Sequence, residues 1–448
     1  MLPGQPRPSI QLASNRLFAL TVCLFATMGC SSSSQPGKSK HQKAETKKSA
    51  TKSASPKQKA NNNHSKKATK PTAVSKSTAQ SITADELNQG WLSLFDGKTL
   101  FGWKPAKPAN WRVENGTIAV DQGKVGLLCT TTQFADYELR LEFKSDKGTN
   151  SGIFLHTPPV PTNPAEDCYE LNIADQDNPF PTGSLVRRQK VVGPHDKTDW
   201  QEFAVTLQGA QVTVKLDGKQ VLQYSDKKPL RRGFIGLQHN KGRVAFRNIR
   251  IRPLGTKSIF NGKDLNGWKQ YPKMKSRFSV TKEGWMNVKD GSGQLETTKS
   301  YADFVLQLQC ITHAKDLNSG IFFRCIPGAV MMGYESQIHN GYKEGDRTNP
   351  IDYGTGGIFR RTKARSVVAD DEQWFHKTLI ADGRHMAAWV NGVQVSDWTD
   401  PRAANENPRR GSRTDAGTIM IQGHDPTTDI SFRGLKIVEM PNRTVTKP

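Results

Sequence analysis

The sequence predicts an all-β protein with two tandem β-sandwich domains. Three observations indicate this fold class. Polar and apolar residues alternate in short segments, Asp-Gly or Asn-Gly dipeptides lie between some of these segments, and motifs of the first half of the 448-residue chain return in the second half. No long stretch has the apolar spacing of an amphipathic helix. We therefore expect two antiparallel sandwiches of jelly-roll type, each large enough to bury a full core.

The internal repeat has the size of a domain. The segment Leu94–Trp103 (LFDGKTLFGW) returns as Ile259–Trp268 (IFNGKDLNGW), and Asn150–Phe154 (NSGIF) returns as Asn318–Phe322. The two copies are offset by about 165 residues, whereas the repeats of a solenoid would recur every 20–50 residues. The chain therefore contains two domains with one ancestor, and polar residues that recur in both copies become candidates for function.

Strands and turns can be assigned in corresponding places of both copies. Alternating segments at 137–143 and 304–310 predict strands with one face toward a core and one toward water. Asp217-Gly218 and Asn391-Gly392 each separate two apolar runs. Such dipeptides favour a type I′ hairpin turn, because both central residues of that turn need a positive φ.

The first 30 residues predict an export signal. Arg7 and Arg16 precede a short apolar run, Leu17–Met28, which ends at Gly29-Cys30. This order is typical of a secretory signal, and the Cys after Gly resembles a bacterial lipobox. We expect a lipid-anchored Cys30 in the cell envelope, periplasmic or at the outer membrane. Ordinary secretion and an uncleaved anchor are the alternatives.

Residues 31–85 predict a disordered linker between the signal and the domains, which we place at 86–254 and 255–448. The linker carries twelve lysines and almost no large apolar side chain, so it cannot bury a core. It contributes much of the chain's formal net charge of +23. A solvated tether and contact with an anionic polymer both fit this composition. No nucleic-acid-binding motif accompanies the charge, so we expect no nucleic-acid partner.

The four cysteines of the two domains show no metal-binding spacing. Cys129 and Cys168 lie in the first copy, and Cys310 and Cys325 lie in the second. No CxxC or Cys/His cluster indicates zinc. Export permits disulfides, and Cys310 and Cys325 end two neighbouring predicted strands, so a bridge between them and buried free thiols are both open.

Several motifs together resemble the 3-keto-disaccharide hydrolase domain family. They are Phe-(Asp/Asn)-Gly-Lys, Asn-Ser-Gly-Ile-Phe, Tyr-Glu-x-x-Ile and a final Phe-Arg, and they span roughly 91–253 and 256–440. The resemblance implies a concanavalin-like jelly roll that acts on glycosides oxidised to a ketone at sugar carbon 3. The family is abundant in planctomycetes and Bacteroides-like bacteria, so a planctomycete-like lipoprotein is the expected context.

The chemistry that the resemblance implies differs from ordinary glycoside hydrolysis. The ketone acidifies the hydrogen on carbon 2, a base removes it, the aglycone leaves from carbon 1, and water adds back. One base, one donor to the enolate oxygen and one acid suffice, without the paired carboxylates of most glycosidases. An upstream sugar oxidoreductase would have to supply the ketone. The alternative is a lectin-like protein that binds glycans without cleaving them, since jelly rolls support both functions.

Recurring titratable residues are the candidate catalytic groups. Glu170 follows Tyr169 in a predicted strand, and Glu335 follows Tyr334 in the matching strand. Alternation puts each Glu on the opposite strand face from the apolar residues; a solvated face or a salt bridge is the structural alternative. His239 and His424 recur near the end of each copy and are candidate proton shuttles.

Recurring polar residues are the candidate substrate-binding groups. Asn and Gln can hold sugar hydroxyls, and His, Arg and Lys can stabilise an oxyanion or polarise a ketone. Turn formation and a basic edge strand are the structural alternatives. These candidates are Asn150, His156, Asn172, Arg187 and Lys190 in the first copy, and Asn318, Arg324, Gln337, Arg360 and Lys363 in the second. Their oxygens could also hold a divalent metal, although no spacing requires one.

Two stretches distinguish the second copy from the first. Asn340–Asp352 and Trp398–Arg413 are rich in charged residues, Gly and Pro. Long irregular loops of this kind usually carry function or are disordered. We therefore expect either that the copies differ in substrate, or that one copy binds and the other cleaves.

Overall fold

The computed structural model describes residues 81–193 and 199–442, and these described residues belong to one compact unit. The predicted signal peptide, with Cys30, and nearly all of the predicted linker lie outside the described residues. No helix within 81–193 and 199–442 is long and apolar enough to cross a membrane. The first described element is the short helix α1 (Ala84–Gln89), which Thr83 and Glu86 cap by exchanging hydrogen bonds.

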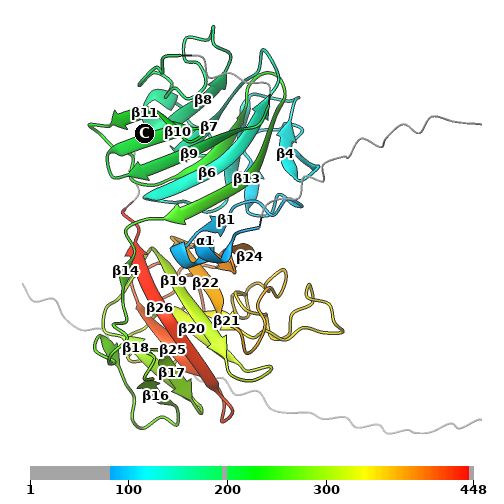
Figure 1. The fold of residues 1–448 in the computed structure, drawn as a ribbon. Coiled ribbons are helices and arrows are strands. Elements are labelled where there is room, and N and C mark those ends of the chain that lie inside the picture. Colours follow the sequence, from blue (N-terminus) through cyan, green and yellow to red (C-terminus); the bar gives the residue numbers. More distant parts are fainter. Residues whose placement is uncertain (1–80, 194–198, 443–448) are drawn as a thin grey trace, which may run out of the picture. The chain divides into compact units, whose positions relative to one another are not determined.

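The first jelly roll (residues 92–253) consists of an eight-stranded and a five-stranded sheet (Figure 1). In the larger sheet, the strands follow the order β11 (Lys219–Ser225), β10 (Gln211–Leu216), β9 (Gln201–Gln208), β6 (Tyr137–Ser145), β13 (Val244–Pro253), β4 (Thr117–Val120) and β3 (Arg112–Glu114), with β1 (Leu92–Ser93) also paired to β13. In the smaller sheet, the order is β2 (Trp103–Pro105), β5 (Gly126–Thr130), β12 (Phe234–His239), β7 (Asn150–Thr157) and β8 (Tyr169–Ala174). The helix α2 (Pro164–Asp167) precedes β8.

The second jelly roll (residues 257–439) repeats this topology strand for strand. Its larger sheet has the order β24 (Val393–Thr399), β23 (His385–Val390), β22 (Phe375–Asp382), β19 (Phe304–Thr312), β26 (Asp429–Glu439), β17 (Met286–Lys289) and β16 (Arg277–Val280), with β14 (Lys257–Ser258) paired to β26. Its smaller sheet has the order β15 (Trp268–Lys269), β18 (Gly293–Thr297), β25 (Thr418–Gly423), β20 (Ser319–Cys325) and β21 (Tyr334–Ile338). The predicted fold, two tandem concanavalin-like jelly rolls, is confirmed.

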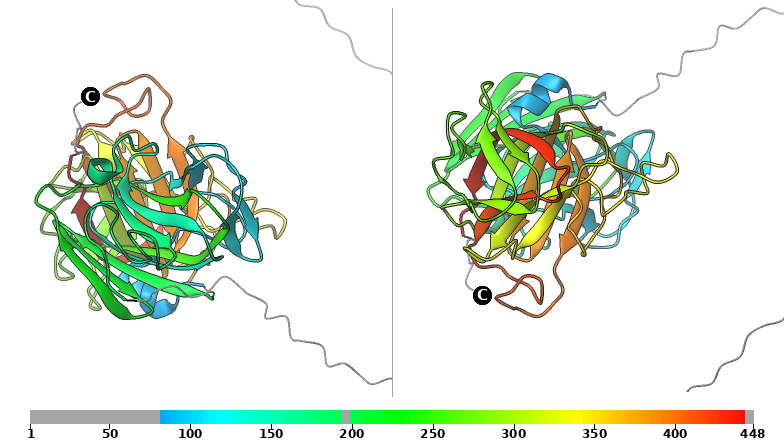
Figure 2. Two further views of the ribbon diagram at one scale, coloured as in Figure 1. Left: turned by 90° about the horizontal axis from the view of Figure 1, so that it is seen from above. Right: turned by 90° about the horizontal axis from the view of Figure 1, so that it is seen from below.

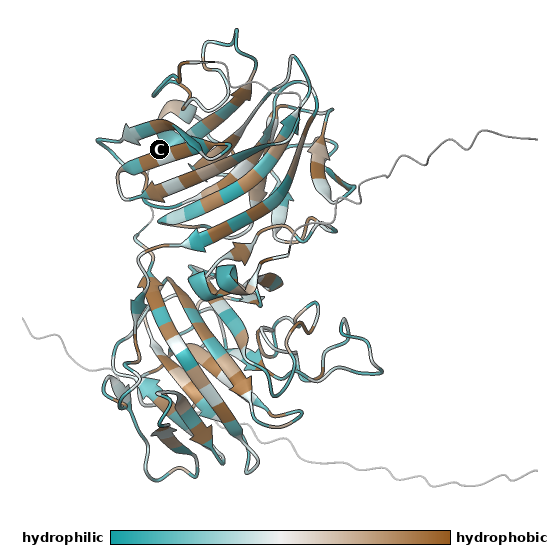
Figure 3. Ribbon diagram, in the orientation of Figure 1, coloured by the Kyte–Doolittle hydropathy of each residue, from teal (hydrophilic) through white to brown (hydrophobic). Residues whose placement is uncertain are grey.

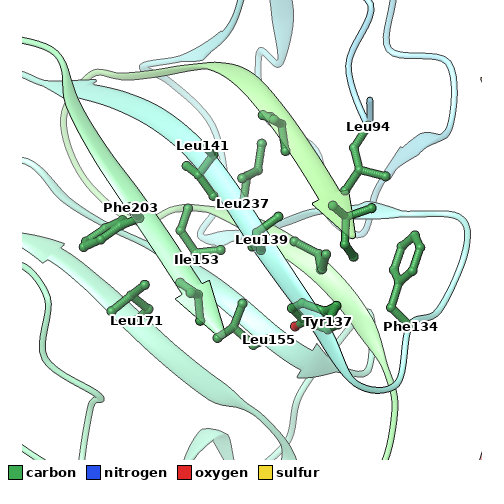
Figure 4. Close-up of a cluster of buried hydrophobic side chains, with 14 of the residues drawn as sticks. Leu94, Phe134, Tyr137, Leu139, Leu141, Ile153, Leu155, Leu171, Phe203 and Leu237 are labelled. Atoms are coloured by element: carbon green, nitrogen blue, oxygen red, sulfur yellow. The ribbon is translucent and has the colours of Figure 1, made fainter. Parts of the chain in front are cut away.

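Apolar side chains from both sheets meet between the two layers. In the first jelly roll, Leu139 and Leu141 of β6 and Phe203 of β9 face Ile153 of β7 and Leu237 of β12 (Figure 4). Polar and apolar bands alternate along the strands (Figure 3), as a sheet with one buried face requires. The alternation that predicted strands at 137–143 and 304–310 is therefore confirmed.

The predicted hairpin turns are also confirmed. Asp217 and Gly218 connect β10 to β11 with φ of 49° and 79°, and Asn391 and Gly392 connect β23 to β24 with φ of 47° and 76°. Both central residues thus have the positive φ of a type I′ turn.

The four cysteines of the two jelly rolls are free, buried thiols. Cys310 belongs to the core between the sheets, whereas Cys325 packs with Phe322 and Met420 in a separate cluster. The feasible bridge between Cys310 and Cys325 is therefore not formed.

Candidate functional site

A polar cavity of about 400 Å³ lies on the five-stranded sheet of the second jelly roll. Strands β20, β21 and β25 supply its floor, and the loops that follow β21 and β24 supply its walls. The loop between β24 and β25 projects beyond the strands (Figure 2). The lining residues are Asn318, Phe322, Met331, Gly333, Tyr334, Glu335, Gln337, Asp352, Phe359, Arg360, Arg361, Pro408, Arg409, Gln422 and His424.

Glu335 provides the titratable group of this cavity. Its neighbours in β21, Tyr334 and Ile338, face the core, so alternation turns the Glu335 side chain to the opposite face, as predicted. Burial, and then the charge of Asp352, raise the pKa of the Glu335 carboxyl to about 8, and Arg409 is the strongest of the nearby cations that oppose the shift. The group can therefore exchange a proton near neutral pH.

The Asn-Ser-Gly motif makes room for this carboxyl. A Cβ atom added at Gly320 would lie 2.5 Å from Oε1 of Glu335. Ser319, by contrast, donates a hydrogen bond of 2.7 Å to the backbone carbonyl oxygen of Gln422 and ties β20 to β25. In the second copy, the motif thus serves both the sheet structure and the cavity.

A carboxylate and two amides form a hydrogen-bonded cluster next to Glu335. Oδ2 of Asp352 accepts hydrogen bonds from Asn318 (2.7 Å) and from Gln337 (2.6 Å). Among the described residues, Oε1 of Gln337 and Oε1 of Gln422 are buried without a hydrogen-bond partner. Two buried acceptors at one cavity are costly unless a donor reaches them, and sugar hydroxyls are such donors.

Three guanidinium groups line the cavity, from Arg360, Arg361 and Arg409, and we call them the cationic wall. Arg360 occupies the place of Arg187 in the first jelly roll, and both have a positive φ of 57° and 59°. No ion pair joins the cationic wall to a carboxylate of the described residues. The wall therefore leaves positive charge available beside Glu335.

His424 joins the cavity, but His239 does not occupy the matching position. Gln238 and Gln422 occupy equivalent positions, because they pair with the second residue of the equivalent strands β5 and β18. The next residue is His239 in the first copy and Gly423 in the second, so His424 lies one position further on. A shift by one residue moves a side chain to the other face of a strand. His239 is buried, and His424 is half exposed beside Asp425, with Nδ1 and Oδ2 3.1 Å apart. The two histidines therefore recur in sequence without occupying the same strand position.

His156 and Arg324 are equivalent, but the cavity contains neither. Both stand at a bulge with a φ of 50° and 49°, and both are buried. His156 approaches the carbonyl oxygens of Ala135 (2.7 Å) and Leu230 (3.0 Å). Arg324 donates to the carbonyl oxygen of Ala302 (2.8 Å) and pairs with Asp303 (2.9 Å). They hold the ends of strands together and do not face the cavity.

The first jelly roll keeps the strand positions of the site but arranges the side chains differently. Glu170 accepts a hydrogen bond of 3.2 Å from Gln238, and burial raises the pKa of its carboxyl. Asn172 donates to the backbone carbonyl oxygen of Phe180, whereas its counterpart Gln337 donates to a carboxylate. A cavity of about 160 Å³ beside Gln238 is lined mainly by apolar and proline side chains.

The remaining candidates have different surroundings. Asn150 and Asn318 occupy equivalent positions before Gly152 and Gly320, and only Asn318 lines the large cavity. Lys190 and Lys363 are exposed, and Lys363 is absent from the cavity lining. No group of three or more His, Cys, Asp or Glu side chains that could hold a metal ion occurs within the described ranges.

Sequence reasoning missed several residues that the structure brings to the cavity. Asp352 and Arg409 lie in the long loops, and no motif distinguishes them there. Arg361 follows the candidate Arg360 and matches Arg188 of the first copy, so the repeat does indicate its position. The stretches at 340–352 and 398–413, for which the sequence left function and disorder open, supply Asp352 and Arg409. Lys377 also escaped notice, although it occupies a core-facing position of β22 between Phe375 and Leu379.

Comparison with known proteins agrees with the duplicated fold. The family described as the 3-keto-alpha-glucoside-1,2-lyase-like domain matches twice, over residues 90–252 and 255–438. A 3-keto-disaccharide hydrolase of Bacteroides thetaiotaomicron is 26% identical over 252 residues, which covers 40% of this chain and 87% of the relative. The family model thus matches each jelly roll once.

Solved structures similar to part of the chain include two candidate glycosyl hydrolases of Parabacteroides distasonis. The first is 21% identical, with a TM-score of 0.36, and the match covers 39% of this chain and 98% of that one. The second is 26% identical, with a TM-score of 0.31, over 37% of this chain and 99% of that one. Because the family model covers more than half of the sequence, the chain belongs to the 3-keto-alpha-glucoside-1,2-lyase-like family and carries two tandem copies of its domain.

Proposed function

We propose that the second jelly roll cleaves glycosides that carry a ketone at sugar carbon 3, with Glu335 as the base. The observation that carries this proposal is a titratable carboxyl, with a pKa of about 8, inside a polar cavity of about 400 Å³. Membership of the family, and a relative named as a 3-keto-disaccharide hydrolase, support the choice of substrate.

The reaction follows from the acidity of the carbon next to the ketone. The Glu335 carboxylate takes the hydrogen from carbon 2 as a proton, and the electron pair moves to the C2–C3 bond and the ketone oxygen. The pair then returns to form the C1–C2 double bond, the ketone re-forms, and the aglycone oxygen leaves carbon 1 and takes a proton. Water adds across the double bond, which completes net hydrolysis. A carboxylate with a raised pKa is a stronger base for such a carbon acid than an ordinary carboxylate.

Other cavity residues supply the remaining functions. The Arg360 guanidinium, which is close enough to lower the pKa of Glu335, stabilises the enolate oxygen. His424 stands beside Asp425 at the cavity and gives a proton to the leaving oxygen. The buried oxygens of Gln337 and Gln422 accept hydrogen bonds from sugar hydroxyls.

The first jelly roll binds sugar without cleaving it in this proposal. The hydrogen bond from Gln238 engages the Glu170 carboxylate, and Arg188 pairs with Asp226 at 3.1 Å. These contacts leave fewer free groups for proton transfer than the second jelly roll offers. A binding role for the first copy retains the lectin-like function for that half of the chain.

The cellular context belongs to the same proposal and rests on the sequence. A lipid-anchored Cys30 would hold the protein at the cell envelope, with secretion as the alternative. A sugar oxidoreductase would have to form the ketone before Glu335 can act, because an unoxidised glycoside lacks an acidic hydrogen on carbon 2.

The test is aglycone release by the full chain from a 3-keto-glucoside and from its unoxidised parent. We expect release from the keto compound alone. Glu335→Gln should abolish it and Glu170→Gln should retain it, which makes the first-copy variant a matched control. Release from the unoxidised parent, or full activity of Glu335→Gln, would contradict the proposal.

A further inference from the structure

A tyrosine–aspartate pair recurs in both jelly rolls, with different arginine partners. Tyr169 donates a hydrogen bond of 2.8 Å to Asp226 in the first copy, and Tyr334 donates one of 2.7 Å to Asp400 in the second. In the first copy, Arg188 completes this arrangement, because it pairs with Asp226 and lies over the ring of Tyr169. Arg188, Tyr169 and Asp226 thus contact one another, and Asp226 serves as the carboxylate partner of the arginine.

In the second jelly roll, the corresponding aspartate, Asp400, pairs with a different arginine, Arg402. Arg402, from the loop between β24 and β25, contacts both carboxylate oxygens of Asp400, at 2.7 and 2.9 Å. Arg361 is the counterpart of Arg188, because Ile358 and Leu185 bridge to equivalent residues of β21 and β8. Arg361 consequently has no carboxylate partner among the described residues, and it lines the cavity.

The surroundings of the Arg361 guanidinium leave its positive charge without an ion-pair partner. Its guanidinium donates only to backbone carbonyl oxygens, those of Arg360 (3.2 Å) and Arg409 (3.1 Å). Burial, and then the nearby charge of Arg402, lower the pKa of Arg361, and the charge of Asp400, which Arg402 pairs with, opposes this shift. A cation that is partly buried, close to another cation and without a carboxylate gains most from a negatively charged ligand.

The same loop adds a second guanidinium to the cavity. Arg409 donates a hydrogen bond of 2.7 Å to the carbonyl oxygen of Met331 and forms no ion pair with the described residues. Asp352 is the neighbouring carboxylate, and two amides already engage it. At neutral pH, Glu335 is mostly protonated because of its pKa of about 8, so the cavity carries an excess of positive charge.

We propose that this cavity selects glycosides that bear an anionic group, a carboxylate or a sulfate ester, which Arg361 and Arg409 bind. Guanidinium groups suit both anions because they donate parallel hydrogen bonds to two oxygens. The inference rests on the proposed function only in assigning a sugar to the cavity. One guanidinium is sufficient for the enolate oxygen, and Arg360, which recurs as Arg187, supplies it. Arg361 and Arg409 are then free for a charged substituent.

The test measures binding to the full chain by titration calorimetry at low salt. The ligands are methyl glucoside, methyl glucuronide and methyl glucoside 6-sulfate, all unoxidised. We expect at least one anionic sugar to bind about tenfold more tightly than the neutral one, as one charge-assisted contact provides. The uronide and the sulfate ester separate the two sources of negative charge.

Variants show whether the cavity or the general positive charge of the protein causes the tighter binding of anionic sugars. Arg409→Gln should reduce the preference for the anionic sugar about tenfold, and Arg361→Gln should do the same. Arg410→Gln is the matched control, because Arg410 is the exposed neighbour of Arg409 and does not line the cavity. Arg409 is exposed, so its substitution tests the idea even if Arg361→Gln impairs folding.

Three results would overturn the inference: equal binding of neutral and anionic sugars, no binding of either anionic sugar, or an equal loss in Arg410→Gln. Because the ligands carry no ketone, their binding is independent of cleavage. If the protein cleaves neutral and anionic keto-glycosides equally well, the proposed function stands and the anion preference fails.

Discussion

The Lys377 ammonium group donates a hydrogen bond of 2.9 Å to the backbone carbonyl oxygen of Gln337, from inside the core of the second jelly roll. Lys377 lies opposite Leu308 of β19, and Phe203 lies opposite the equivalent Leu141 of β6. A lysine therefore stands where the first copy has a phenylalanine. Burial lowers the pKa of the Lys377 amine to about 7. A buried, titratable group thus lies on the core side of the strand whose other face carries Glu335.

The first prediction concerns stability. Lys377 has a folded pKa of about 7 and an ordinary pKa of 10.5, so the unfolded chain binds more protons between these pH values. The free energy of unfolding should therefore rise with pH across this window, and the cost of burying the charge is complete below pH 7. Lys377→Met should increase the free energy of unfolding by about 1–4 kcal/mol at pH 7, as apolar replacement of buried ionic groups often does.

Urea unfolding at pH 7 and at pH 9.5 measures this effect. The advantage of Lys377→Met should shrink at the higher pH, where the wild-type amine is neutral. The Gln337 carbonyl oxygen keeps a partner in the variant, because Gly356 N–H also donates to it at 2.9 Å. A variant that is less stable than the wild type at pH 7 would show that the lysine hydrogen bond outweighs the cost of its charge.

The second prediction concerns the pH dependence of cleavage. A base must be deprotonated, so kcat/KM should rise with pH until about 8, the pKa of Glu335. Asp352→Asn removes a negative charge that raises this pKa, so the rise should move to lower pH. Lys377→Met removes the fraction of positive charge that the amine still carries near this pH, so the rise should move to higher pH by a smaller amount.

Shifts of opposite sign distinguish electrostatics from a general loss of structure. Asp346→Asn is a suitable control, because Asp346 is exposed on the same loop as Asp352 and does not line the cavity. Its profile should match that of the wild type. If the Asp352 and Lys377 variants shift in the same direction, Glu335 does not set the profile.

The third prediction concerns the Gly of the Asn-Ser-Gly motif. Gly320→Ala places a methyl group where the Glu335 carboxyl stands, with Cβ 2.5 Å from Oε1 in the present arrangement. The carboxyl must move, and kcat should fall at least about tenfold, since small displacements of catalytic groups are costly. Gly152→Ala is the matched change in the first copy, where the nearest atom, a backbone oxygen of Leu171, is 3.0 Å away. Kinetics that are unchanged in Gly320→Ala would remove Glu335 from the reaction.

The fourth prediction separates a structural arginine from a catalytic one. Arg324→Met removes an ion pair with Asp303 and leaves the carbonyl oxygen of Ala302 without this donor. Loss of one partner from such a buried network costs about 3–5 kcal/mol of unfolding free energy. Urea unfolding should show this loss, and the folded fraction should keep its kcat. Normal stability with a lost kcat would instead support the oxyanion role that the sequence indicated.

The fold could be predicted because the alternation of each strand and the internal repeat can both be recognised directly in the sequence. Tyr334 and Ile338 face the core and Glu335 faces away, as the two-residue period requires. The same period separates His239 from His424. One extra residue, Gly423, stands before His424, and the register with β18 shows that His239 corresponds to this Gly.

Of the cationic wall, Arg360 could be predicted from its recurrence, but the free guanidinium of Arg361 could not, because it depends on which arginine reaches which aspartate. Arg188 and Arg361 look equivalent in sequence, yet Arg402 displaces only the second from its carboxylate. That exchange is a contact between residues 400 and 402 in a loop without regular structure, and hydrophobic periodicity carries no information about it. Lys377, in contrast, could have been found, since a lysine in a core-facing position of a strand is unusual.

The free thiols offer a way to follow how each half of the molecule opens. Cys129 and Cys168 belong to the first jelly roll, and Cys310 and Cys325 to the second, and all four are buried. Burial raises the pKa of Cys129 and of Cys168 to about 12, so the native thiols are protonated and unreactive at neutral pH. Alkylation during partial unfolding, read by peptide mass, would therefore label the half that opens first.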